Sequence, residues 1–194
     1  MNLKLNKFLI IILIGIVSTN IQGQEKFEKE SRLKSKDVPK TALNFIEEAQ
    51  ISGKVKWYIE YGLETTSIEA KFKMNRKWYS VEFDTLGIIE DVEIEIKFKD
   101  LKTKIKKAIE STLNNICETH KIFKIQKQFS GDQNVLISVL KQEETQESFD
   151  IKYELVAKCV KENKSEQFEF LFSDEGQLIN TSKIIFKKSN NLEY

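Results

Sequence analysis

Residues 79–96 read YSVEFDTLGIIEDVEIEI, and this stretch predicts a β-hairpin. Tyr79, Val81 and Phe83 alternate with polar residues, which is the period of a strand that buries one face. Turn-forming residues follow at 84–87 and end in glycine. The alternation resumes over residues 88–98 and slips at residues 90–91, so we expect a β-bulge in the second strand.

The flanking sequence continues this alternation between strands and helices. Further strand patterns cover residues 55–61, 68–74, 121–129, 149–159, 167–172 and 177–186. One helix is predicted to open at Val38-Pro39, and a second is predicted to follow Asp100 as its N-cap. Residues 134–140 fit a short helix or a strand, and Asp132 as a cap favours the helix. The side chains expected between helices and sheet are Phe45, Trp57, Phe72, Val81, Phe83, Ile105, Ile109, Tyr153, Phe170 and Phe172.

The hairpin sequence occurs twice. Residues 168–176, FEFLFSDEG, align with residues 79–87, YSVEFDTLG, at a constant offset of 89. We therefore predict an α+β fold in which two tandem helix-plus-four-strand units form one antiparallel sheet with the helices on one face. The first unit would span residues 38–98 and the second residues 99–187, followed by a tail at residues 188–194.

This pattern resembles a known family. Val38-Pro39, Val55-x-Trp57, the hairpin, DLKTKIKKAIE, YELVAKCV and FEFLFSDEGQLI follow the layout of tandem PepSY-like, β-lactamase-inhibitor-like proteins secreted by Bacteroidetes-type bacteria. The resemblance covers about residues 38–186. The chain departs from the family at Leu101-Lys102, where the family has proline, and in the extra residues 130–148. The resemblance implies a small extracytoplasmic binding or inhibitory domain without catalysis, and it carries over no set of functional residues.

The N-terminal segment predicts export. Residues 1–23 combine Lys4 and Lys7 with an apolar run over residues 8–17 and a small residue at Gly23, which is the layout of a secretory signal peptide. We therefore expect a periplasmic or secreted protein with no stable membrane span after cleavage. Residues 24–37 are charged and lack a period, so they predict a solvated linker.

Charge and cysteine content exclude several classes of protein. The 194 residues carry 31 basic and 30 acidic side chains, a balance that gives no support for a nucleic-acid partner. One histidine and two cysteines cannot build a multi-imidazole or four-cysteine metal site. No nucleophile-elbow, phosphate-loop or zinc-helix motif occurs, so we predict no enzyme, no catalytic or metal-binding residues and no cofactor.

Cys117 allows two alternatives. An oxidising compartment would let it pair with Cys159, although two buried thiols are equally consistent with the sequence. Cys117 and His120 could instead serve a thiol- or metal-dependent enzyme, with no orienting partner visible.

The sheet face away from the helices is the candidate protein-binding face. Strand alternation places Tyr58, Lys71, Lys73, Trp78 and Glu82 on it. Exposed aromatic side chains among charges are typical of interface anchors. The alternative is that Tyr58 and Trp78 cover each other or pack under residues 24–37. We therefore expect a non-enzymatic module that binds an unknown envelope or secreted protein, inhibition being one version of this function; an accessory structural protein of the envelope is the third hypothesis.

Overall fold

The computed structural model describes residues 24–26, 29–62 and 65–185. The predicted signal peptide and C-terminal tail lie outside these residues. The helices and strands are, in chain order, β1 (Gln24–Lys26), β2 (Lys29–Leu33), η1 (Ser35–Asp37), α1 (Lys40–Glu48), β3 (Lys56–Tyr61), β4 (Thr66–Met74), β5 (Lys77–Phe83), β6 (Ile89–Glu95), η2 (Phe98–Asp100), α2 (Thr103–Ile116), β7 (Thr119–Ser130), α3 (Gln133–Lys141), β8 (Asp150–Lys161), β9 (Lys164–Ser173) and β10 (Leu178–Ile184).

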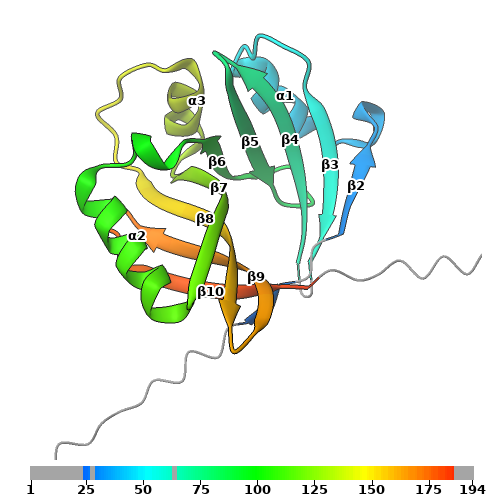
Figure 1. The fold of residues 1–194 in the computed structure, drawn as a ribbon. Helices are drawn as coiled ribbons and strands as arrows, with labels where there is room; N and C mark the ends of the chain where they lie inside the picture. Colours follow the sequence, from blue (N-terminus) through cyan, green and yellow to red (C-terminus); the bar gives the residue numbers. More distant parts are fainter. Residues whose placement is uncertain (1–23, 27–28, 63–64, 186–194) are drawn as a thin grey trace, which may run out of the picture.

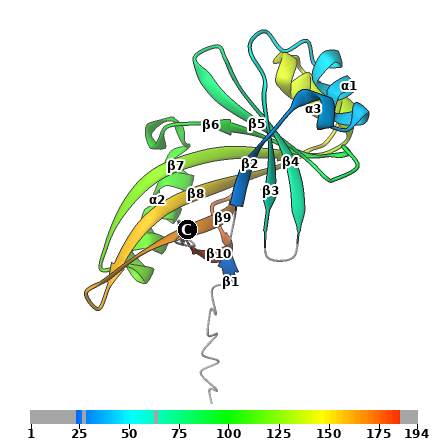
Figure 2. The ribbon, with the colours of Figure 1, turned by 90° about the vertical axis from the view of Figure 1, so that its right-hand side faces the viewer.

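All the strands belong to one sheet. Their order is β1-β10-β9-β8-β7-β6-β5-β4-β3-β2, and every neighbouring pair is antiparallel except β1 and β10. The predicted bulge is confirmed, because Glu82 pairs with Asp91 while Phe83 pairs with Ile89, so Glu90 is the extra residue. Strands β7 and β8 are long and strongly bent (Figure 2).

The helices lie in two groups on this sheet. Helices α1 and α3 lie together at one end, and α2 lies over β8, β9 and β10 at the other (Figure 1). Residues 134–140 belong to helix α3, so the structure confirms the helical alternative. The second helix begins at Thr103 with Lys102 as its N-cap, whereas Asp100 ends the preceding turn, so the predicted cap is wrong.

Each helix group covers its own apolar core. The ten side chains predicted to be buried are all buried, including Phe83 and Phe170 at 0% exposure. Phe45 packs edge-on against Phe83 with ring centroids 5.5 Å apart. These positions follow from strand and helix periodicity alone, which explains why the sequence predicted them.

The prediction of two helix-plus-four-strand units is wrong. The described residues form one predominantly antiparallel sheet with three α-helices, and the cores do not divide at residues 98–99. Phe129, Leu136, Ile137 and Leu140, all from the predicted second unit, complete the core under α1. The extra residues around α3 therefore fill the first core instead of extending a second unit.

The two matching turns are nevertheless built alike. Gly87 and Gly176 both have positive φ, and each packs against a helix, Gly87 on α1 and Gly176 on α2. A Cβ atom at Gly87 would lie 2.8 Å from the Cβ of Pro39, and one at Gly176 would lie 2.7 Å from the Cβ of Ala108. The sequence similarity between residues 79–87 and 168–176 therefore reflects the same kind of turn, in which the glycine of a hairpin packs closely against a helix.

The segment predicted as a solvated linker forms strands instead. Strand β1 pairs with β10 at one edge of the sheet, and β2 pairs with β3 at the other. Lys26 and Lys29 are three residues apart, which limits their Cα atoms to a separation of about 11 Å. The described residues 24–26 and 29–33, hereafter the strap, thus pair with the two opposite edges of the curled sheet (Figure 2). An edge strand has unpaired backbone N–H and C=O groups. Because these groups form hydrogen bonds with any extended backbone, even a charged segment can pair with them as a strand.

Candidate functional site

The helix-free face of the sheet is polar and carries a row of acidic side chains. Glu69 on β4 pairs with Glu82 on β5, and Glu82 pairs with Asp91 on β6. Like charges directly opposite each other on neighbouring strands repel, so this row is unfavourable when all three are ionised. Glu82, predicted to belong to the binding face, lies half-buried in this row and not at the exposed end of the face.

Burial raises the pKa of Glu82 and Asp91 in this row and of Glu93 beside it. The pKa of Asp91 rises to about 7, because burial first, and then Glu154 and Glu90, disfavour its charge. Burial likewise raises the pKa of Glu82 and Glu93, with Asp91 adding to it for Glu82 and Glu154 for Glu93. The interior of this face therefore retains protons at a pH at which free carboxyl groups have lost them.

Lysines of the sheet and strap neutralise part of this acidity. Lys26 on the strap donates to Glu169 on β9 at 2.7 Å. Burial alone would lower the pKa of Lys26, but Glu154 and Glu169 outweigh it and raise that pKa. Lys71 on β4 pairs with Glu30 on the strap and, at 2.7 Å, with Glu69.

Three carboxylates in this region come close enough to hold a metal ion. Oxygen atoms of Glu30, Glu60 and Glu69 lie within 4.8 Å of one another. The ammonium group of Lys71 contacts both Glu30 and Glu69, and it already supplies a positive charge there. One ammonium group against three carboxylates neutralises the group only in part, and Lys71 already occupies the space between two of them, so we interpret it as a structural ion-pair cluster.

Beyond the acidic row, the face opens into two adjoining hollows. The first measures about 340 Å³ and crosses from β3 to β7; its walls include Lys56, Tyr58, Lys71, Trp78, Ser80, Glu95, Lys124 and Gln126. The second, also about 340 Å³, surrounds the ends of β5 and β6; it is lined by Asn75, Arg76, Lys77, Trp78, Glu95, Ile96, Lys97, Lys99 and Asp100. Trp78 and Glu95 belong to both.

Trp78 is the most exposed aromatic side chain of the first hollow. It is 47% exposed, and the ammonium of Lys73, its cross-strand partner, lies 5.6 Å from the indole centroid. Trp57, the other tryptophan, is 4% exposed and belongs to the core. The predicted opposite placement of the two tryptophans is thus confirmed.

Tyr58 shares the hollow but is partly covered by the strap. Arg32, its partner on β2, donates to the Tyr58 hydroxyl at 3.1 Å and stacks 5.1 Å from its ring. The ammonium nitrogen of Lys71 lies 5.2 Å from the centroid of the same ring. The alternative in which residues 24–37 pack on Tyr58 therefore holds, whereas Trp78 keeps almost half of its surface exposed.

Sequence reasoning missed the half of the hollow that β6 and β7 provide. Lys124, Gln126 and Glu95 reach it because β7 pairs with β6. The alternation of polar residues at 124, 126 and 128 was the available signal, but it could not name the neighbouring strand.

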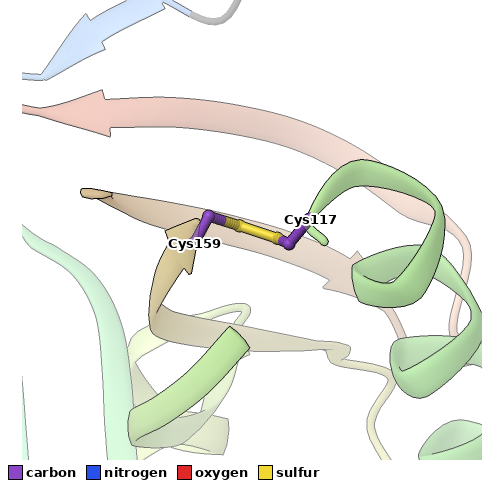
Figure 3. The surroundings of a disulfide bond; sticks show 2 residues. All are labelled: Cys117 and Cys159. Carbon is purple, nitrogen blue, oxygen red and sulfur yellow. A yellow bond between two sulfur atoms is a disulfide. The ribbon is translucent and has the colours of Figure 1, made fainter. Parts of the chain in front are cut away.

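The two cysteines form a disulfide that joins the end of α2 to β8 (Figure 3). Their Cα atoms lie 5.2 Å apart, within the range of bonded cysteines. His120 on β7 pairs in register with Cys159 on β8. While the disulfide is intact, Cys117 supplies no thiolate for a pair with His120.

Among the described residues, no helix is both long and apolar enough to cross a lipid bilayer.

Comparison with solved structures finds a distant likeness. The chain is similar to the crystal structure of a DUF2874 family protein from Bacteroides ovatus ATCC 8483, with 13% identity and a TM-score of 0.49, over 75% of this chain and 87% of that chain. No family model matches the chain, and no curated protein matches it. We infer neither activity nor ligand from a likeness at this level.

Proposed function

We propose that this protein is a non-enzymatic binding module that works outside the cytoplasm. Its binding site is the pair of hollows that meet at Trp78, and its ligand is another protein of the envelope or of the secreted set. Inhibition of an enzyme is the version that the PepSY-like and β-lactamase-inhibitor-like resemblance suggests.

The exposed indole of Trp78 carries this proposal. Burial of apolar surface gains roughly 25 cal/mol per Å², so a half-exposed tryptophan between two hollows offers a partner considerable free energy. Ligand sites are commonly concave and lined by aromatic side chains with a few polar groups, as here. The charged side chains around it provide orientation and specificity.

The thiol-dependent alternative has less support. It requires a thiolate at Cys117, which the disulfide removes, and the described hollows around Trp78 contain neither Cys117 nor His120. Loss of function in His120→Ala, with the fold intact, would favour that alternative over the binding module.

Trp78→Ala tests the proposal directly. We expect it to lose most partner affinity while the thermal midpoint moves little, because Trp78 contributes surface and not core. Wild-type and Trp78→Ala baits would be compared in capture from an extract of cells that produce the protein, and a protein retained only by wild type would then be titrated in purified form. Tyr58→Ala should weaken binding less, because Arg32 and Lys71 cover part of its ring.

Two outcomes would contradict this site. Full affinity of Trp78→Ala for the purified partner would remove the hollows from the binding site. Lost affinity together with a midpoint many degrees lower would instead assign Trp78 to the core.

A further inference from the structure

The hollows around Trp78 carry a concentration of positive charge that the whole chain lacks. The first is lined by Lys56, Lys71 and Lys124 against Glu95 alone. The second is lined by Arg76, Lys77, Lys97 and Lys99 against Glu95 and Asp100. Since the chain as a whole has a net charge of only +1, this imbalance is local to the hollows.

Several of these cations lack an acidic partner. Within residues 24–26, 29–62 and 65–185, no salt bridge engages Lys56, Lys77 or Lys97. Lys56 on β3 lies directly opposite Lys71 on β4, but Glu30 and Glu69 already pair with Lys71, so the positive charge of Lys56 is left for a ligand.

The apolar side chains of the hollows indicate which class of anion could bind there. Tyr58 and Trp78 line the first hollow, and Ile96 adjoins Trp78 in the second. An extended polypeptide can present carboxylates and apolar side chains side by side, which matches a lining of lysines and aromatic side chains. Lysines act as single point charges, and the one arginine of these hollows cannot form a set of bidentate phosphate clamps.

We propose that the two hollows bind an acidic stretch of an extended polypeptide, with Trp78 packing on its apolar side chains and the surrounding lysines pairing with its carboxylates. This inference rests on the proposed binding function and names the chemistry of the partner. The acidic row of Glu69, Glu82 and Asp91 lies next to the hollows on the same face, so an acidic segment that entered deeper into the sheet would meet carboxyl groups there and not lysines.

Binding of short synthetic peptides tests the inference with the intact protein. The probes are fluorescein-labelled octapeptides of alternating Glu and Ala, Gln and Ala, or Lys and Ala, followed by fluorescence anisotropy at low salt. We expect the Glu peptide to bind about tenfold more tightly than the Gln peptide and the Lys peptide not to bind, which corresponds to about 1.4 kcal/mol from several exposed ion pairs. Raising the salt concentration should remove most of the difference.

Matched variants locate the site. Lys97→Gln combined with Lys99→Gln should weaken binding of the Glu peptide several-fold, and Trp78→Phe should preserve it while abolishing a peptide-induced change in tryptophan emission. Lys161→Gln combined with Lys164→Gln removes the same charge from the β8–β9 hairpin and should leave affinity unchanged. Equal loss in both double variants would overturn the inference, because binding would then reflect net charge alone.

Two further results would also overturn it. Equal affinity for the Glu and Gln peptides would show that carboxylates are not recognised. Tighter binding of an oligogalacturonate or a DNA oligonucleotide than of the Glu peptide would assign the hollows to another class of polyanion. In either case, a captured partner that depends on Trp78 would leave the proposed binding function standing, so the two failures are distinguishable.

Discussion

Asp91 is the residue whose chemistry the fold changes most visibly. It is 9% exposed, one of its oxygens accepts from Gln128 at 3.0 Å, and the other has no hydrogen-bond partner among the described residues. Its negative charge is repelled by Glu154, by Glu90 beside it in the chain, by Glu69, and by Glu82 on the neighbouring strand. Lys152 attracts that charge and opposes the effect in part. Ionisation of Asp91 is therefore costly in the folded state.

Asp91 makes stability depend on pH. Its folded-state pKa of about 7 lies above its ordinary value of 3.8, so its contribution to stability is fully present below the ordinary value and is lost as the pH rises towards 7. We expect the urea midpoint of wild type to be lower at pH 8 than at pH 5 and Asp91→Asn to show a shallower decrease. The decrease persists in part because Glu82 and Glu93 have raised pKa values too. Identical pH profiles for wild type and variant would contradict this account.

Phe83 tests the assignment of faces. It is fully buried between Phe45 and Trp57, so Phe83→Ala should lower the free energy of unfolding by about 3 to 5 kcal/mol. Phe123, which is 49% exposed on β7, provides the matched control, and Phe123→Ala should change stability by no more than about 0.5 kcal/mol. Chemical denaturation measures both; similar losses in the two variants would refute the assignment.

At the scale of elements, the disulfide fixes α2 to the sheet. Cys117 is the C-cap of α2, and the bond to Cys159 on β8 closes 42 residues of chain. Such a crosslink typically adds about 2 to 4 kcal/mol by restricting the unfolded chain. We expect reductant to lower the thermal midpoint of wild type, while a Cys117→Ser, Cys159→Ser double variant starts lower and does not respond to reductant. A reductant-insensitive wild type would show that the bond contributes no stability.

Helix α3 shows what element-level prediction could and could not supply. Its sequence fits either a helix or a strand; Asp132 at the N-cap position favours the helix, and the burial of Val135, Leu136 and Leu140 against the sheet stabilises it. This burial depends on contacts with β6 and β7. Strand β7 directly precedes α3 in the chain, whereas β6 is distant from it in sequence. The local sequence pattern therefore allowed a helix or a strand, and packing against the sheet stabilises the helix.

At the scale of the whole molecule, the strap is the critical feature. It pairs with β10 and β3, and Lys26 and Glu30 form ion pairs with the sheet face. A chain that begins at Lys34 would leave both edges unpaired, so we expect a lower thermal midpoint and concentration-dependent association, measured by light scattering. A chain that begins at Gln24 keeps the strap and is the control. Equal stability and equal mass of the two truncated chains would show that the strap is dispensable.

The sequence by itself determined which side chains lie on which face. Trp57, Val81 and Phe170 are in the core and Trp78 is outside it, because alternation along a strand is a local property of the backbone. The two glycine turns were equally readable, since each requires a residue that tolerates positive φ.

Only the tertiary structure decided which strands became neighbours beyond the hairpin of β5 and β6, and what they enclose. No periodicity in residues 24–33 predicts a strand, because the hydrogen-bonding demand comes from the edges of β3 and β10. The same holds for the raised pKa of Asp91 and for the presence of Lys124 and Trp78 in one hollow, which depend on strands far apart in the chain. Alternation specifies a face, but the charge and shape of a site on that face depend on the pairing order, which is set by the free energy of the whole sheet.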